Sequence, residues 1–438
     1  MAANGCDGGV PKGPSRVIPD QSKRAVPASL LRIASTVPPS TAICGRAHPE
    51  TGSKRASHCG SPRPSGCVVT LGVKAWLTIQ IEPSFPKDAT GGPTGWRRSA
   101  SCSGAVQPAE SVKRWANYPG TGSPFIQNKG KPYLDGINWI TILDAPQRAI
   151  QIQDGEIDTL RGPAFQDISR LQADKTLTVT QLKEWSGYFM TTNFGRTDLG
   201  FDDVNVRQAL SHAIDRKGIV KALLFDHGTP LYGPITTADK SYTKDVEQFN
   251  QFDTGKASSL LGAAGWKAGS DGILRKNGVR FAFEMIIQSE SFNQQLGSAI
   301  QAQMKAIGVD LKVTSLDRGT FFNKAFALPD SLMFFYLWPV PIDVVTLFVN
   351  SANANGKGPN WSNAVLPQMD QAVAAWQSAA NESQLNAAGK QFQVVVAEQL
   401  PFIPIINRDA FWVNRQNVHG WHPDQWNLYP YYNDVWLG

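Results

Sequence analysis

Cysteine is missing from most of this 438-residue sequence. All five cysteines lie in the first 102 residues, at Cys6, Cys44, Cys59, Cys67 and Cys102. Their spacings match no zinc-binding or redox pattern. Residues 103–438 therefore hold no cysteine nucleophile, and a region without thiols suits an oxidising compartment.

Long apolar runs are also missing. No stretch of the sequence approaches the roughly 18 apolar residues that a membrane-spanning helix needs. The first residues contain no basic segment followed by an apolar one, so no secretory signal is readable in this chain. Composition alone therefore favours a soluble globular class.

Motifs of catalysis are absent as well. The sequence contains no Gly-x-Ser-x-Gly elbow, no Gly-x-x-x-x-Gly-Lys-Ser/Thr loop and no His-Glu-x-x-His helix. His419 and His422 are three residues apart, but no cysteine or third ligand lies near them in the sequence. We therefore predict no catalytic residue, no metal site and no cofactor, which favours a protein that is not an enzyme.

Charge is distributed unevenly along the chain. Residues 1–110 hold 13 Lys and Arg against six Asp and Glu, a net charge of +7. The whole chain carries +6, so residues 111–438 carry a net charge of −1. This near neutrality argues against nucleic-acid binding by the later part. Residues 1–110, rich in Pro, Gly, Ser and Arg, are expected to be a low-order segment, apart from a possible strand at 67–81.

Residues 202–235 have the pattern of two short helices and a turn. Apolar residues at helical spacing define one face of each helix, namely Val206, Leu210, Ala213 and Ile214, and then Ile219, Val220, Leu223 and Leu224. Asp202 or Asp203 is expected to cap the first helix and Asp215 the second. Gly228 and Pro230 then end the second helix.

The amino-acid sequence of this stretch resembles a signature of the family 5 extracellular solute-binding proteins, the receptors that deliver peptides and other solutes to ABC importers. Members commonly read Val-Arg-x-Ala-x-x-x-Ala-Ile-Asp-Arg, then a helix, then Gly-x-Pro and a later Gly-Pro. The matching residues are Val206, Arg207, Ala209, Ala213, Ile214, Asp215, Arg216, Gly228, Pro230, Gly233 and Pro234. Arg207, His212 and Asp215 are expected to have structural roles.

Phrases at residues 131–136, 155–158 and 401–404 also resemble the family. The resemblance covers about residues 111–438. It implies an α/β fold of the two-lobed type II periplasmic-binding-protein class. It also implies a monomeric periplasmic receptor that holds a peptide or other small solute between its lobes and delivers it to ABC permease subunits, with no nucleic acid as partner.

The resemblance also implies a division of the chain. Residues 111–195 are expected to be the remaining part of the first lobe, and 196–400 the second lobe. Residues 401–438 return to the first lobe, and 187–202 are the candidate for the first hinge strand. Residues 1–110 do not resemble the family.

The candidate solute-binding residues follow from position. Aromatic side chains supply rigid contact area for ligands, and open α/β sheets hold ligands at loops after their strands. Other candidate residues lie where the chain is expected to return from the second lobe to the first. The candidates are Trp338, Asp343, Asn360, Trp361, Asn407, Arg408 and Trp412.

One departure from the family concerns the solute. Peptide-binding members commonly carry Trp-x-Ala-Asp-Tyr-x-Asp-Pro after this strand, and the first Asp pairs with the α-amino group of the peptide. Aligned on Asp343 as the second Asp, the first falls at Val340, and Val344 replaces the Pro. A sugar, an opine or another solute is then as plausible as a peptide with a free amino terminus.

A second departure concerns the N-terminal part. Members usually have a longer segment before the phrase at residues 131–136, so we expect a truncated or frame-shifted chain with an incomplete first lobe. Three alternatives stay open: a regulator that fuses a DNA-binding segment to this receptor domain, an enzyme on the same scaffold, and a non-functional product. Against the first, residues 1–110 hold no clear helix-turn-helix pattern.

Overall fold

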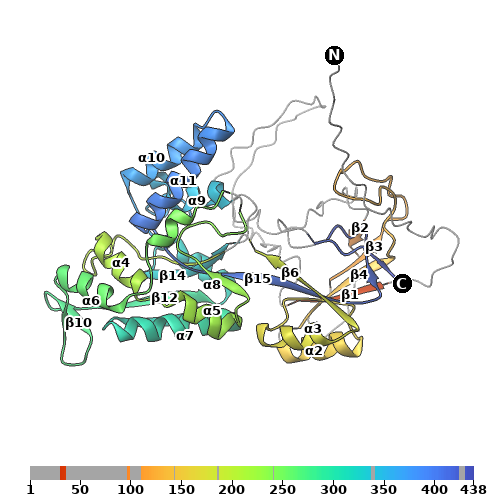
Figure 1. The fold of residues 1–438 in the computed structure, drawn as a ribbon, viewed down its shortest axis with the longest axis horizontal. Helices are drawn as coiled ribbons and strands as arrows, with labels where there is room; N and C mark the ends of the chain where they lie inside the picture. Colours follow the sequence, from red (N-terminus) through yellow and green to blue (C-terminus); the bar gives the residue numbers. More distant parts are fainter. Residues whose placement is uncertain are drawn as a thin grey trace, which may run out of the picture.

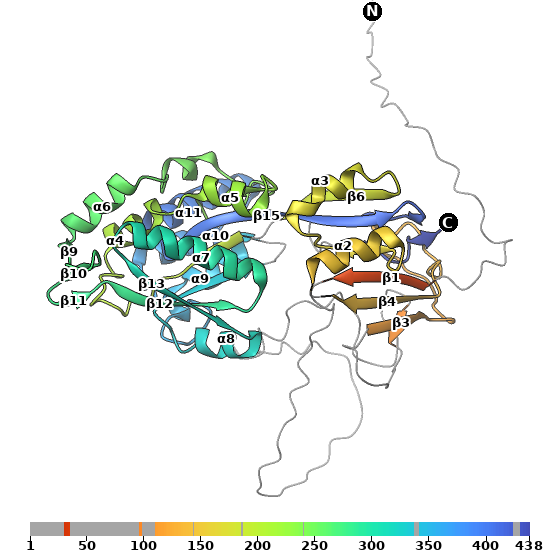
Figure 2. The ribbon, with the colours of Figure 1, turned by 90° about the horizontal axis from the view of Figure 1, so that it is seen from below.

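The described residues form two α/β bodies that lie side by side (Figures 1 and 2). In this computed structural model the chain is described at residues 30–35, 96–98 and 110–438, without 143, 185–186, 240, 337–340 and 424–429. One long strand, β15 (Ile403–Arg415), runs through both bodies. The predicted mixed α/β fold is confirmed.

The first body has a mostly parallel centre. Its strands are β1 (Leu30–Ser35), β2 (Trp96–Arg98), β3 (Glu110–Arg114), β4 (Gly136–Thr141), β5 (Thr159–Arg161) and β6 (Leu177–Lys183). Its helical elements are α2 (Ala145–Asp154), η3 (Phe165–Asp167) and α3 (Ile168–Ala173), and β16 (Val418–His419) pairs with β17 (Trp436–Leu437). Asp144 caps α2 and Gly155 ends it with a φ of 79°, as the sequence predicts.

Strand β1 occupies the middle of this sheet. It lies between β4 and β5 and runs parallel to both, so the predicted β-α-β unit of β4, α2 and β5 crosses over a strand from far upstream. Leu31 and Ile33 are fully buried. The Asp158 carboxylate accepts hydrogen bonds from the Arg32 backbone N at 2.7 Å, from Nε at 3.1 Å and from Nη2 at 3.0 Å. Apolar burial and a charged anchor therefore both hold this strand.

The expected low-order segment thus contributes two strands. Leu30–Ser35 and Trp96–Arg98 belong to the sheet, although neither was predicted as a strand. The strand predicted at residues 67–81 lies outside the described residues. Leu31 and Ile33 flank Arg32 and are buried between β4 and β5, so a short apolar stretch inside a segment of otherwise irregular pattern becomes a core strand.

Strand β15 changes partners halfway along its length. Its first half pairs antiparallel with β7 (Gly187–Met190) and β8 (Gly228–Pro230), and its second half pairs with β6 and β5. The change falls between Arg408, opposite Gly228, and Asp409, opposite Lys183. The chain therefore returns to the first body at this point.

The second body is built on a sheet of order β13–β12–β14–β7–β15. Its strands are β12 (Ala282–Gln288), β13 (Asp310–Leu316) and β14 (Ser331–Tyr336), with a small hairpin sheet of β9 (Lys267–Ala268), β10 (Leu274–Lys276) and β11 (Val279–Arg280). Its helices are α4 (Val204–His212), α5 (Arg216–Leu224), η4 (Lys244–Gln248), α6 (Thr254–Ala263), α7 (Ser291–Ala306), α8 (Arg318–Ala325), α9 (Pro341–Val349), η5 (Ser351–Asn353), α10 (Pro367–Gln377) and α11 (Glu382–Gln399).

Helices cover both faces of this sheet. Met285 and Ile287 of β12 belong to a core shared with α4 to α7, whereas Ile286 points to the opposite core, shared with α8 to α11. A strand that is buried on both faces reads as a nearly continuous apolar run. The body is a three-layer α/β/α unit.

The two helices of residues 202–235 are held by caps and buried arginines. Asp203 caps α4, and Asp215 caps α5 by accepting from Gly218 N at 2.9 Å, which confirms the predicted caps. The Arg216 guanidinium donates to five backbone carbonyls, among them those of Leu231 at 3.0 Å and Pro404 at 2.7 Å. The stretch thereby ties the second body to the start of β15.

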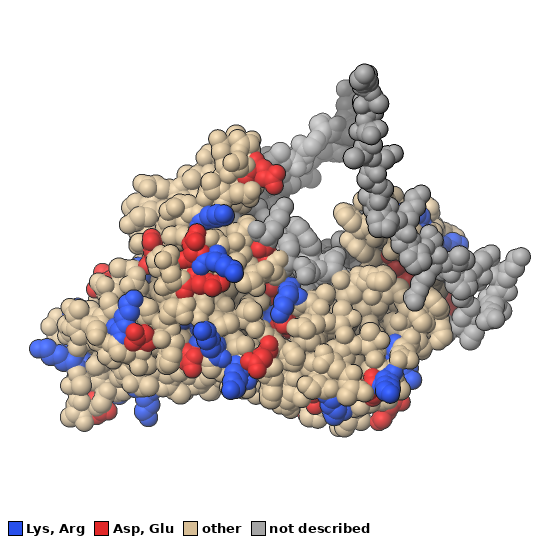
Figure 3. Space-filling model, viewed as in Figure 1, with Lys and Arg blue, Asp and Glu red and all other residues tan. Residues whose placement is uncertain are grey.

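The surface of the described residues gives two further facts. Across the parts of the chain placed in the structure, no helix combines the length and apolarity needed to cross a membrane. On the face in Figure 3, basic and acidic side chains are interspersed over the second body. This face therefore has no large patch of one sign among its described residues.

Candidate functional site

The seam between the two bodies is the candidate site, and Glu184 lies at its centre. Glu184 follows β6 where the chain leaves the first body, and its side chain is buried. Its backbone carbonyl accepts hydrogen bonds from Asn407 Nδ2 at 2.9 Å and Thr236 Oγ1 at 3.2 Å. Its carboxylate Oε2 lies 3.6 Å from Arg408 Nε. The chain passes from one body to the other after β6 and again in the middle of β15. The hydrogen bond from Asn407 and the ion pair of Arg408 join these two passages.

The Arg408 guanidinium is enclosed by rings and carboxylates. It lies over the ring of Tyr188 at 5.6 Å and that of Phe292 at 5.7 Å. Burial lowers the pKa of Arg408, whereas Tyr188, Glu184 and Glu290 raise it, and the net effect is a pKa above the ordinary value. Burial also raises the pKa of Tyr188. Arg408 therefore stays a cation, and Tyr188 stays a neutral hydroxyl, at physiological pH.

Asp409 adds a second buried charge to the seam. Its Oδ2 accepts from Lys183 Nζ at 2.8 Å and from Gln181 Nε2, while Oδ1 has no hydrogen-bond partner among the described residues. The Asp409 side chain is fully buried, whereas Lys183 is about half exposed. Burying a carboxylate oxygen without a hydrogen-bond donor costs folding free energy, and a donor that binds there recovers part of it.

Two of the predicted solute-binding residues, Asn360 and Trp361, make structural contacts inside the second body. The amide of Asn360 donates to Asn350 O at 3.1 Å and Ala364 O at 2.8 Å, and its oxygen accepts from Ala364 N at 3.1 Å. Trp361 packs in the core against the rings of Phe334 and Phe348. Both residues stabilise the loop between η5 and α10.

The predicted residues on β15 separate into two groups. Asn407 and Arg408 lie at the seam, as described above. Trp412 is fully buried in the first body, where its ring meets that of Trp421 edge-on at 4.8 Å. Its position favours a packing role.

The structure says little about the last two predicted residues, Trp338 and Asp343. Trp338 lies outside the described residues. Asp343 was expected on a loop, but its backbone belongs to the first turn of α9, which starts at Pro341. A proline is favoured in the first turn because it gives up no helical hydrogen bond there, and the apolar residues that follow support the helix.

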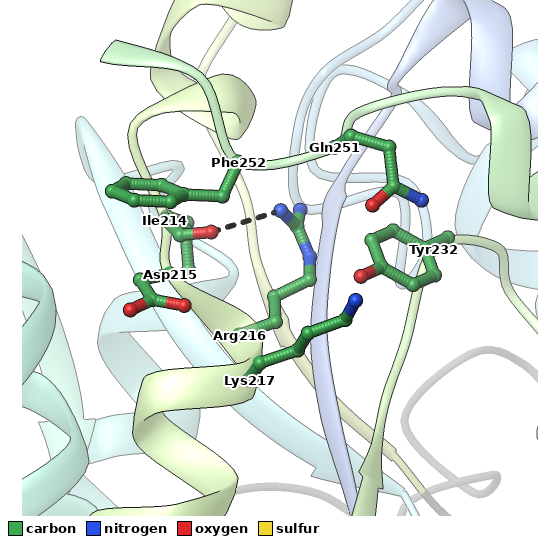
Figure 4. A pocket seen from close by; sticks show the side chains of 7 residues that line it. All are labelled: Ile214, Asp215, Arg216, Lys217, Tyr232, Gln251 and Phe252. Carbon is green, nitrogen blue, oxygen red and sulfur yellow. Dashed lines mark hydrogen bonds between the residues drawn. The ribbon is translucent and has the colours of Figure 1, made fainter.

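A separate pocket of about 210 Å³ lies at the start of α5. Figure 4 shows it lined by Asp215, Arg216 and Tyr232 with Gln251 and Phe252. Burial lowers the pKa of Arg216 to about 10, and its donors are taken by backbone carbonyls such as that of Ile214. Asp215 caps α5, so two of the charged groups that line this pocket, Asp215 and Arg216, already serve the fold.

Histidines and carboxylates do not converge elsewhere in the described chain. Among the residues that the structure describes, no group of three His, Cys, Asp or Glu side chains is placed to hold a metal ion. The ring of His419 stacks on Trp436 at 4.0 Å. His212 is buried and its Nδ1 contacts the carbonyl of Gln251, which confirms a structural role.

Sequence reasoning missed several residues of the seam. Glu184, Tyr188 and Phe292 come together from chain positions up to 108 residues apart, and Arg408 meets them from further away. Each looks ordinary in its own stretch. The only available signal was a lone acidic residue at the end of a predicted strand, which is too common to single out a site.

Comparisons with known proteins identify the family. A model of the bacterial extracellular solute-binding proteins, family 5, matches residues 107–358, which is more than half of the chain. The oligopeptide-binding protein AppA of Bacillus subtilis is 31% identical over 188 residues, 42% of this chain and 34% of AppA. The dipeptide-binding protein of Escherichia coli is 24% identical over 299 residues, 67% of this chain and 54% of that protein.

Solved structures agree with these relatives. AppA of Bacillus subtilis in complex with a nonapeptide superposes with a TM-score of 0.66 at 22% identity, over 78% of this chain and 66% of that one. NikZ of Campylobacter jejuni in complex with Ni(L-His) gives 0.64 at 21% identity, over 78% and 67%. The chain spans between a third and just over half of the curated relatives. It belongs to the bacterial extracellular solute-binding proteins of family 5.

Proposed function

We propose that this chain is the solute receptor of an ABC importer. It captures a peptide or another small solute between its two lobes and delivers it to permease subunits in the membrane. It works in the periplasm as a monomer and catalyses no reaction itself. Membership of family 5 supports the receptor role.

The arrangement of the two bodies carries the proposal. Strand β5 of the first body and β12 of the second body both end at the seam, where Phe165 and Phe292, which follow them, are in contact. Open α/β sheets hold ligands outside the carboxyl ends of their strands. Only two chain crossings join the bodies in the described residues, and such a joint permits closure around a solute.

We propose boundaries for the lobes on the same basis. The first lobe comprises residues 30–35, 96–98, 110–184 and 409–438, and the second lobe comprises 187–408. The sequence placed the boundary at residues 195 and 196, one strand later. The antiparallel pairing of β7 with β14 supports the earlier boundary.

Arg408 and Asn407 are the proposed solute contacts among the predicted residues. Trp338 and Asp343 stay predictions. A cation enclosed by Glu184 and Glu290 leaves a slightly acidic surrounding, and this suits a solute that carries both an anionic and a cationic group, such as a peptide. The relatives bind an oligopeptide, a dipeptide and a nickel–histidine complex, and a peptide is the first solute to test.

A thermal-shift and calorimetric screen tests the proposal. The panel contains dipeptides, a nonapeptide, Ni(II)–L-histidine, sugars and opines. A solute at one hundred times its Kd stabilises the folded state by about 2.7 kcal/mol, which appears as a Tm higher by several degrees. If no member of the panel raises Tm or releases heat, the receptor proposal fails for these classes.

Arg408→Gln tests the proposed contact. We expect binding to be roughly ten- to 150-fold weaker, because a charge-assisted hydrogen bond contributes roughly 1.5–3 kcal/mol. The change also leaves the buried Glu184 without its cation, so the double variant Glu184→Gln/Arg408→Gln is measured beside it. Binding that recovers in the double variant would show that Arg408 only supports the fold. Arg275→Gln, in the exposed hairpin of the second lobe, is the control.

A further inference from the structure

Phe165 of the first lobe makes a direct contact with the second lobe. It opens η3, and its ring lies 6.2 Å from that of Phe292 at the start of α7. The ring of His227 stacks on that of Phe165 at 6.5 Å, with an angle of 22° between the planes. Phe165 is half-buried against the core that α4 to α7 share. The η3 element of the first lobe contacts α5 of the second, and Figures 1 and 2 show α3 and α5 on either side of the seam.

His227 is held firmly in this position. Its carbonyl accepts a hydrogen bond from Asp409 N at 3.0 Å. Its ring meets Phe411 edge-on at 5.1 Å, and Phe411 also lies 6.3 Å from Phe165. Phe225 and Asp226 precede it with φ angles of 50° and 64°, a left-handed turn that such residues adopt rarely. This turn directs the chain so that the His227 ring lies between β15 and η3.

We propose that Phe165 is an aromatic clasp: its contacts with Phe292 and His227 hold the lobes together before any solute enters. Opening the seam would expose the faces of three rings to water, and burial of these rings favours the closed arrangement. The clasp therefore sets the fraction of solute-free receptor that is already closed.

If the chain is a solute receptor, the clasp also affects solute affinity. This effect on affinity rests on the proposed function, whereas the clasp itself does not. The apparent Kd of a receptor equals its intrinsic Kd divided by the fraction that is competent to bind. Weakening the clasp lowers that fraction. We expect Phe165→Ala to weaken binding of the most stabilising panel solute about three- to tenfold.

Solute-free small-angle X-ray scattering tests the clasp by itself. Phe165→Ala is expected to increase the radius of gyration and Phe165→Leu to increase it less, while melting curves confirm that both variants are folded. Phe125→Ala is the matched control, because Phe125 is an exposed phenylalanine of the same lobe that stacks only within it, on Tyr431. Phe292→Leu approaches the same contact from the second lobe and should mimic Phe165→Leu.

The outcomes separate the two proposals. An unchanged radius of gyration in both Phe165→Ala and Phe292→Leu overturns the clasp, whether or not a solute binds. A larger radius together with no binding by any panel solute supports the clasp and contradicts only the receptor role. A double variant Phe165→Ala/Phe292→Leu that opens no further than Phe165→Ala supports a direct contact between the two rings.

Discussion

The two lobes differ in how the chain assembles them. The second lobe forms from one continuous stretch of the chain, residues 187–408, which ends with the first half of β15. In the described residues the first lobe is assembled from four separated pieces: the strands at residues 30–35 and 96–98, residues 110–184, and the part of the chain from 409. The same α/β architecture is therefore built in one case by near neighbours and in the other by distant partners.

This difference determines where each lobe is vulnerable. Contacts between residues far apart in sequence cost more chain entropy to close than local ones. In the first lobe a single six-residue strand, β1, lies between β4 and β5, so its loss would separate two halves of a sheet. In the second lobe the buried guanidinium of Arg216 joins helices α4 and α5 to the start of β15 through its hydrogen bonds.

Ile33→Asp is expected to break the first lobe with the largest effect. It buries a carboxylate without a partner at a fully buried position in β1, and we expect a loss of about 4 kcal/mol. Hydrogen exchange should show lost protection in β4 and β5, with β12 and α7 still protected. Ile150→Asp, on the exposed side of α2, is the control. Equal loss of protection in both lobes would contradict their independence.

Arg216→Met is expected to weaken the second lobe almost as much. The change leaves several buried carbonyls, including those of Ser211 and Pro404, without a donor, and we expect a loss of about 3–5 kcal/mol. The urea midpoint of the second lobe measures this loss. Its exposed neighbour provides the control, since Lys217→Met should leave the midpoint unchanged. A small effect for Arg216→Met would mean that water replaces its hydrogen bonds.

Asp158→Ala sharpens the comparison at the anchor of β1. It removes the acceptor of three hydrogen bonds from Arg32, and we expect the first lobe to lose about 2–3 kcal/mol. Chemical denaturation followed by first-lobe tryptophan fluorescence measures it. Asp154→Ala removes an exposed carboxylate from the end of α2 and should have little effect. The idea fails if both variants behave alike.

His212 predicts a smaller effect, which is confined to the second lobe and depends on pH. Burial lowers the pKa of His212, so the folded state binds a proton less readily than the unfolded state. Its contribution is complete above the ordinary His pKa of about 6.5 and is lost as the pH falls from there through the lowered pKa. His212→Gln should flatten the dependence of the urea midpoint on pH between these values, and His422→Gln, at an exposed site, should not.

Local signals in the sequence predict much of this fold. Asp144 and Gly155 correctly mark both ends of α2, and Asp215 caps α5. Asn277 and Gly278 both have positive φ, as the hairpin between β10 and β11 requires. Such signals act within a few residues, so they can be read without knowledge of the fold.

Features that depend on distant partners escape this kind of prediction. Strand β1 is fixed by β4 and β5, which lie more than 100 residues later, and its own composition does not distinguish it. The contact between Glu184 and Arg408 joins two crossings that only the finished sheet brings together. The family signature predicted the receptor fold, whereas the residues of the seam had to come from the structure.

Strand β15 also has a consequence for the order in which the protein is completed during synthesis. The ribosome makes residues 409–415 only after all of the second lobe, yet β5 and β6 of the first lobe pair with them. The second lobe, residues 187–408, therefore leaves the ribosome before these residues do. The lobe that is begun first is therefore finished last, and until then the free edges of β5 and β6 are open to pairing with other chains.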